Sequence, residues 1–347
     1  MREEKRKKDK FDEFIEIKRT LPLFCNEFFN AHDARYQIGT KLAYAGDLRV
    51  FLSYLLNAFP DKFPYEKIED ITLQDIASLQ STDIDDYLLY LTEYEMDGKI
   101  YKNSEQGKKR KLMCLKALYK HFGHIGKIDR SPAEFVYIPK IKEKDIVVIS
   151  QKEKDRIEDD IETGRRKTEQ AQKYHEKTKY RDMAIYKLFL STGIRVSELV
   201  NLDDADVDFA EQRVFVTRKG GKYEAVYFNK EALFALLDYM DIERNQLLGR
   251  SADQQEIRNE PLFVSRQKKR ISVRMVEIII KNYTSGVMVG TKATPHTLRK
   301  TFGTELYGET GDLYLVQKAL GHASVSTTQR HYAKFPEEKL KQIRERK

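Results

Sequence analysis

A proline-containing, charged stretch near the middle of the chain separates two regions of different pattern. It reads DRSPAEFVYIPKIKEKD over residues 129–145, and Pro132 and Pro139 each prevent a continuous helix. A chain of 347 residues is too long for one typical domain and suits two, each with its own core. We therefore expect a linker over residues 126–149 that joins two domains.

The first region has the periodicity of helices. Apolar residues recur at helical spacing from Leu42 to Phe59, and a further helix is predicted from Ser104 with Gly123 as its stop. Thr82 and Asp85 resemble a capping box before YLLYL. These patterns predict an all-helical domain over residues 21–125, preceded by a basic arm over residues 1–20.

The second region mixes helices with a short β-structure. RVFVTRKGGKYEAVYF has β-branched and aromatic residues on both sides of Gly220–Gly221, which predicts a hairpin. A polar insertion, RRKTEQAQKYHEKTK, precedes a buried helix that ends at Gly193. Further helices are predicted at 151–162, 232–248, 273–283, 297–307 and 313–320. The predicted fold is mainly α, with a mixed domain at residues 150–335 and a tail helix at residues 336–347.

Positive charge is concentrated in three places. The net charge is +8, with basic runs at Lys5–Lys10, at GKKRK (residues 107–111) and at SRQKKRISVR (residues 265–274). One such run is as consistent with a solvated face as with a ligand site, but three of them favour a polyanion such as nucleic acid. The candidate DNA-binding residues are Lys108, Lys109, Arg110, Lys111, Lys268, Lys269 and Arg270.

Several other chemistries lack the residues they need. No apolar stretch is long enough to cross a bilayer, and the charged N-terminus does not resemble a secretion signal. The series Asp204, Asp206 and Asp208 fails as a calcium loop, because Phe replaces the required Gly and Glu. His121 and His124 fit a packed or solvated pair better than a metal site. We expect no metal and no cofactor.

A set of residues suited to phosphate chemistry runs through the second region. A Tyr332 nucleophile would need cations to hold phosphate oxygens, and arginine suits this role because its planar fork stays charged. Arg195 follows a Thr-Gly helix stop, with Glu198 one turn later as an orienting partner. The remaining candidates are Lys219 in the hairpin turn and His322 after a glycine, together with His296 and Arg299 in HTLR. His296 and Arg299 are three apart, on one face of a helix predicted to begin at Pro295. Each of these motifs alone is ordinary.

Their order resembles the tyrosine recombinase (phage integrase) family. The resemblance covers the whole second region and gives the six active-site positions as Arg195, Lys219, His296, Arg299, His322 and Tyr332. TGIRVSELVNLDDADVDF, VTRKGGK and TPHTLRKTFGTELY are most similar to single-chain Xer recombinases of the XerS type. One departure is His331, which stands where many Xer proteins have the tyrosine, while the His-Tyr order is common in phage and transposon integrases.

The resemblance implies a helical core-binding domain and site-specific DNA strand exchange through a 3′-phosphotyrosyl intermediate. It also implies double-stranded DNA with paired half-sites, a homotetramer on two DNA sites, and a cytoplasmic, nucleoid-associated protein. An Xer-type role in chromosome dimer resolution would add a DNA translocase partner; the alternative is integration of a phage or transposon. Rival classes are a type IB topoisomerase, a two-metal transposase, and a DNA-binding protein of this fold that does not cleave.

Overall fold

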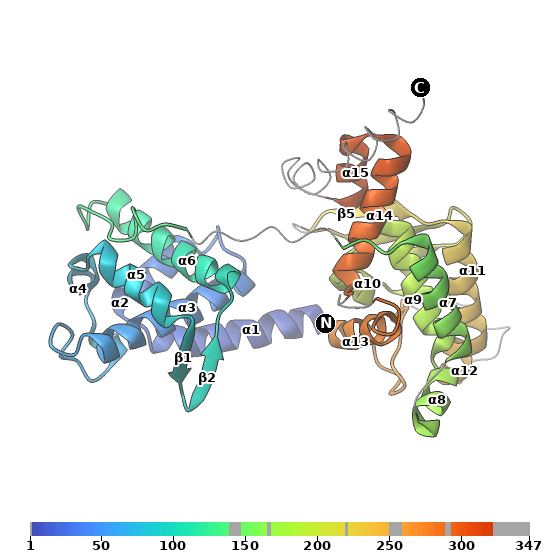
Figure 1. The fold of residues 1–347 in the computed structure, drawn as a ribbon, viewed down its shortest axis with the longest axis horizontal. Helices are drawn as coiled ribbons and strands as arrows, with labels where there is room; N and C mark the ends of the chain where they lie inside the picture. Colours follow the sequence, from blue (N-terminus) through green and yellow to red (C-terminus); the bar gives the residue numbers. More distant parts are fainter. Residues whose placement is uncertain are drawn as a thin grey trace. The chain divides into compact units, whose positions relative to one another are not determined.

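The chain divides into two compact units, residues 1–143 and 144–347, which are described separately (Figure 1). The division falls inside the predicted linker. The computed structural model describes residues 2–138, 147–164, 168–218, 221–249, 259–288 and 293–321. Among these residues, no helix is both long and apolar enough to cross a membrane.

The first unit is a helical domain with one small hairpin. Helix α3 packs against both α1 and α6, and a continuous apolar core includes Phe28, Phe51 and Tyr119. The unit comprises α1 (Arg2–Arg19), α2 (Leu23–Ala31), α3 (Ile38–Ala58), η1 (Ile68–Asp70), α4 (Leu73–Ala77), α5 (Ser81–Tyr90), β1 (Glu93–Met96), β2 (Lys99–Lys102) and α6 (Glu105–His124).

The N-terminal segment predicted as a basic arm is a helix that joins this core. Phe14 of α1 is 4% exposed and meets Phe29 edge to face, with 5.2 Å between the ring centroids. On the same helix Lys18 donates a hydrogen bond to Asn30 at 2.7 Å. The many lysines of this segment obscured an apolar edge in the sequence. That edge packs the second half of α1 against the core of the first unit.

The hairpin of β1 and β2 was not predicted. Its strands pair antiparallel, with Tyr94 opposite Tyr101, and the turn lies at Asp97 and Gly98, both with positive φ. Asp-Gly is a strong signal for this turn because both central residues need positive φ. The expectation of an all-helical domain was therefore wrong over residues 93–102.

Two helix ends in this unit also differ from the prediction. Helix α5 begins two residues earlier than expected, after Gln80 rather than Thr82. Asp83 accepts from the Gln80 amide at 2.8 Å in place of the predicted Thr82–Asp85 box. Helix α6 begins after Ser104 as predicted but continues to His124, and the left-handed turn is at Gly126 rather than Gly123.

The second unit surrounds the buried helix α9 and carries a three-stranded antiparallel sheet of order β3-β4-β5. Its elements are α7 (Gln151–Thr163), α8 (Glu169–Glu176), α9 (Lys179–Thr192), α10 (Val196–Asn201), η2 (Asp204–Asp206), β3 (Val207–Asp208), β4 (Arg213–Thr217), β5 (Tyr223–Tyr227), α11 (Lys230–Asp238), η3 (Tyr239–Arg244), α12 (Asn245–Leu248), α13 (Val273–Thr284), α14 (Pro295–Thr310) and α15 (Leu313–Leu320).

Most of these elements were predicted from the sequence. Strands β4 and β5 form the expected hairpin, in which Val214 faces Val226. Helix α9 ends at Gly193, where φ is +59° and an added Cβ would lie 2.4 Å from Phe302. A glycine is therefore required both by the left-handed turn and by the close approach of α14.

The predicted helix over residues 232–248 is interrupted by a π-helical segment, η3. Its Tyr239 hydroxyl donates to the Leu262 carbonyl at 3.1 Å, and Arg244 donates to the Pro261 carbonyl at 3.0 Å. Between them Glu243 is 8% exposed and accepts from the Arg181 amide at 3.1 Å. Burial raises the pKa of Glu243 to about 7, although the neighbouring Arg181 guanidinium opposes this shift.

The raised pKa of Glu243 predicts a pH-dependent loss of stability. Because its pKa is higher in the folded state, its contribution is fully present below the unfolded value near 4.5 and is lost as pH rises through about 7. Glu243→Gln should therefore gain stability relative to the original protein between pH 5 and pH 8, by at most about 3 kcal/mol. Denaturant titrations followed by circular dichroism measure this difference. The exposed Glu211→Gln is the control, and a Glu243→Gln difference that does not change with pH would contradict the prediction.

Candidate active site

Helix α14 supplies two of the predicted site residues. Pro295 occupies its first turn, and Thr297 accepts from the Thr294 amide at 3.0 Å, so the helix start is fixed as predicted. His296 is exposed at this end, whereas Arg299 is 3% exposed. The Arg299 guanidinium donates to the carbonyl of Gly193 at 2.5 Å and to that of Leu320.

Arg195 lies directly before helix α10 and is oriented by Glu198. The Arg195 amide donates to one carboxylate oxygen of Glu198 at 2.8 Å, and its guanidinium donates to the other at 2.7 Å. The guanidinium also reaches the Gly321 carbonyl at 3.1 Å. Since the Arg195 side chain is 33% exposed and that of Glu198 is 4% exposed, the arginine offers a partly open cation on a buried anionic support.

Arg195 and Arg299 therefore meet at the C-terminal end of α15, on the adjacent carbonyls of Leu320 and Gly321. The carbonyl end of a helix attracts cations, which helps to hold two guanidinium groups close together. His322 is the next residue along the chain. Arg195 and Arg299, which are far apart in the sequence, thus lie together at the end of α15.

A third arginine at this point, Arg218, was missed. Its guanidinium donates to Glu198 at 2.9 Å, to Glu224 at 3.2 Å and to the Ala319 carbonyl at 3.0 Å. Arg218 is 7% exposed, and a Cβ on Gly321 would lie 2.8 Å from its Nε atom. In the sequence it is one more basic residue beside Lys219, with no pattern that marks it as buried.

Three predicted catalytic residues, Lys219, His322 and Tyr332, lie outside the described residues, as does the predicted tail helix. Lys219 follows Arg218 and His322 follows Gly321. The described residues before them, Arg218 and Gly321, lie against each other.

The described part of the site carries an excess of positive charge. Two carboxylates, Glu198 and Glu224, pair with Arg195, Arg218 and Lys222. Arg299 adds a further cation on the Leu320 carbonyl. Guanidinium groups present paired donors that match the oxygens of a phosphate. Chemically, this arrangement is suited to binding an anion and to stabilising charge that builds on its oxygens.

The basic residues of GKKRK divide between internal contacts and the surface. Asp47, which is 3% exposed, receives hydrogen bonds from Arg110 and, at 2.8 Å, from the buried Lys111. Lys108 pairs with Glu105 at 3.2 Å, and Lys109 is half-buried. Much of the charge of this motif therefore stabilises the first unit.

The second candidate run divides in a similar way. Lys268 and Lys269 are exposed in a turn, where Lys268 has a φ of +56°. Arg270 instead donates to the carbonyls of Val200 and Leu202, at 3.0 and 2.9 Å, and to Asp203. It therefore holds the C-terminal end of α10, the helix that directly follows Arg195.

The expectation of no metal site rests on the sequence alone. Within the described ranges, no group of three or more metal-ligating side chains is found. His121 packs against Phe28 and His32, with ring centroids 5.7 and 4.9 Å apart. Asp204, from the rejected calcium motif, accepts from Arg244 at 3.2 Å.

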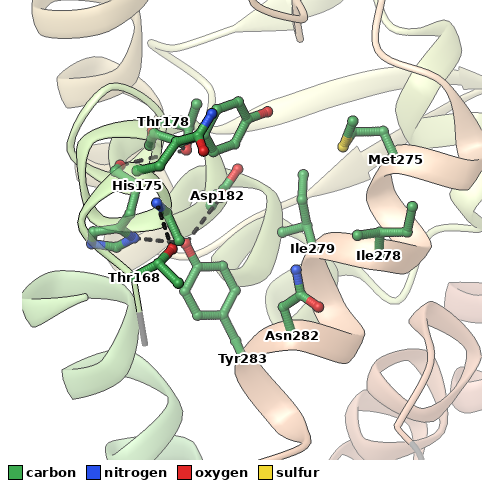
Figure 2. A pocket seen from close by; sticks show the side chains of 12 residues that line it. Thr168, His175, Thr178, Asp182, Met275, Ile278, Ile279, Asn282 and Tyr283 are labelled. Atoms are coloured by element: carbon green, nitrogen blue, oxygen red, sulfur yellow. Dashed lines mark hydrogen bonds between the residues drawn. The ribbon is translucent and has the colours of Figure 1, made fainter. Parts of the chain in front are cut away.

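A cavity of about 480 Å³ lies elsewhere in the second unit, between α8 and α13 (Figure 2). At its base the Tyr283 hydroxyl donates to Asp182 at 3.0 Å and lies 3.1 Å from Nδ1 of His175. The predicted polar insertion thus forms a helix that contributes the buried His175 to the core. No described residue of the arginine cluster lines this cavity.

Comparison with known proteins agrees with the geometry of the site. Residues 145–338 match the model of the phage integrase family. Tyrosine recombinase XerC of Caldanaerobacter subterraneus subsp. tengcongensis is 30% identical over 331 residues, covering 94% of this chain and 86% of that protein. Tyrosine recombinase XerS of Streptococcus agalactiae is 29% identical over 349 residues, covering 92% and 93% respectively.

Solved structures share the fold. A XerH site-specific recombinase bound to a palindromic difH substrate, in a post-cleavage complex, aligns with a TM-score of 0.62 at 21% identity, covering 92% of this chain and 81% of that one. A lambda integrase dimer bound to a core site aligns with a TM-score of 0.61 at 16% identity, covering 89% and 94%. The fold, the family match and the similarity to XerC together establish that this chain belongs to the phage integrase family of tyrosine-type site-specific recombinases.

Proposed function

We propose that the chain cuts and rejoins double-stranded DNA with Tyr332 as the nucleophile. The observation that supports this most directly is the meeting of Arg195 and Arg299 at the end of α15, immediately before His322. Two guanidinium groups on adjacent carbonyls are placed to bind the non-bridging oxygens of a single phosphate.

In the proposed step the Tyr332 oxygen attacks the phosphorus and the bond to the 5′ oxygen breaks. The products are a 3′-phosphotyrosyl link and a free 5′-hydroxyl, and attack by a second 5′-hydroxyl reverses the step on a new strand. Arg195, Arg299 and His322 hold the phosphate oxygens, His296 assists proton movement, and Lys219 protonates the leaving oxygen. The phosphotyrosine conserves the bond energy, so ATP is not required.

In this proposal both units bind DNA. The first unit acts as the core-binding domain and uses the half-buried Lys108 and Lys109 of GKKRK. The exposed Lys268 and Lys269 extend the contact from the second unit. Four protomers assemble on two DNA sites with paired half-sites. The similarity to XerC and XerS favours chromosome dimer resolution on the cytoplasmic nucleoid, with a DNA translocase as partner, over integration of a phage or transposon.

Tyr332→Phe should abolish the covalent protein–DNA adduct and leave DNA affinity nearly unchanged, because only the nucleophilic oxygen is lost. The adduct is trapped on a nicked duplex, with EDTA present, and its attachment site is mapped by peptide analysis. His331→Ala is the matched control and should still form the adduct. An adduct on any residue other than Tyr332 would contradict the mechanism, and an active Tyr332→Phe would do the same.

Arg195→Ala should slow single-turnover cleavage by about 100- to 1,000-fold, the usual loss when one donor to a developing oxyanion is removed. Its DNA dissociation constant should change only a few-fold, since the contact strengthens mainly in the transition state. Cleavage at saturating protein and gel-shift titration separate the two effects. A parallel loss of binding and cleavage would mark Arg195 as an ordinary backbone contact.

Lys268→Ala and Lys269→Ala should weaken DNA binding equally on all sequences. Each lost phosphate contact lowers the slope of log affinity against log salt by about one. Arg270→Ala is the comparison, because it should lower thermal stability through the loss of its contacts to α10. An unchanged salt slope in both lysine variants would remove this turn from the DNA interface.

A further inference from the structure

We propose that Arg218 is a positioning residue for strand cleavage, one that holds Glu198, and through it Arg195, in the geometry required to grip the phosphate. The inference rests on the proposed function and extends it to a residue outside the six expected catalytic positions.

The buried side chain of Arg218 makes several contacts at once. The Arg218 guanidinium is 7% exposed and donates to Glu198 at 2.9 Å, to Glu224 at 3.2 Å and to the Ala319 carbonyl at 3.0 Å. Arginine is suited to this role because its planar fork presents several donors in fixed directions. A lysine would bring the charge without this fixed geometry.

The carboxylate of Glu198 is shared by Arg195 and Arg218. Its Oε2 atom accepts from Arg218 and from the Arg195 amide at 2.8 Å, and its Oε1 atom accepts from the Arg195 guanidinium at 2.7 Å. A carboxylate with a 4% exposed side chain is not held by water, so its orientation depends on these donors. Removing Arg218 would leave Glu198 free to turn, and the Arg195 guanidinium would lose its fixed support.

The backbone of Arg218 and of its neighbours is also held in place. The Arg218 amide donates to the Lys222 carbonyl at 2.7 Å and its carbonyl accepts from Gly221 at 3.0 Å, so Arg218 closes the turn between β4 and β5. Its side chain fills the space beside Gly321, where φ is +59° and an added Cβ would lie 2.8 Å from Nε. One residue thus links the hairpin, helix α10 and the end of α15.

The experiment uses the full-length protein on a nicked DNA substrate. Arg218→Met keeps the volume of the side chain and removes its donors, and it should slow single-turnover cleavage by about 10- to 100-fold, the usual range for residues that orient a functional group. DNA affinity should be unchanged. Arg218→Lys should recover part of the rate. Arg213→Met is the matched control, because Arg213 lies at the other end of β4 and pairs with Asp208 at 2.9 Å.

Two modified substrates identify the route of the effect. A methylphosphonate at the scissile position replaces one non-bridging oxygen by a methyl group and is uncharged, so it should reduce the difference between Arg218→Met and the original protein. A 5′-bridging phosphorothiolate has a leaving group that needs no proton, and it should leave the difference intact. Cleavage by Arg218→Met at the original rate, or rescue by the phosphorothiolate alone, would overturn the proposal.

A measurement without DNA separates this inference from the proposed function. Hydrogen exchange at the amide of Gly321, which donates to the Lys318 carbonyl at 3.0 Å, should become at least about 10-fold faster in Arg218→Met as the end of α15 loosens. Unchanged exchange would overturn the positioning role even if the enzyme cleaves DNA. Failure of the original protein to form a Tyr332 adduct would overturn the proposed function and leave this test in force.

Discussion

The buried carboxylate of Glu198 is the point on which the arrangement of the site depends. A carboxylate removed from water is costly unless cations and hydrogen-bond donors surround it. Glu198 receives a main-chain donor and a guanidinium from Arg195 and a second guanidinium from Arg218. The hydrogen bonds that Glu198 accepts therefore fix the start of α10, the turn of the β4–β5 hairpin and the end of α15 together.

The contacts of these arginines also explain why a glycine, Gly321, directly follows α15. Three successive carbonyls, those of Ala319, Leu320 and Gly321, each accept from a different arginine. Side chains approach so closely that residue 321 has no room for a Cβ atom. The Gly-His pair noticed in the sequence thus reflects dense packing of cations before His322.

Sequence patterns identified the parts of this molecule that are local. Helix α15 has the predicted bounds, and the start of α14 at Pro295 and the stop of α9 at Gly193 follow from backbone chemistry alone. The partner of Arg195 was also accessible, because Glu198 lies three residues away on the same turn. The family resemblance supplied the remaining site positions, since no spacing rule connects residues this distant in the chain.

What the sequence did not reveal depends on tertiary contacts or on overlooked turn chemistry. Arg110, Lys111 and Arg270 look like DNA-binding residues, yet their internal partners, Asp47 and Asp203, come from distant helices or loops. Arg218 was missed for the same reason, because its burial depends on Glu198 and on α15. The hairpin at Asp97–Gly98 was different, since its signal was present in the sequence and was passed over.

In the second unit, the number of residues in the π-helical turn η3 decides which way the following side chains point. Tyr239 and Arg244 are five residues apart, which would separate them by about 140° on an α-helix, yet both reach the carbonyls of residues 261–262. The wider turn carries one residue more than an α-helical turn would hold. If the same residues formed a regular α-helix, α12 would be rotated by about 100° and Arg244 would turn away from Asp204. The extra residue in this turn therefore keeps Arg244 directed at Asp204.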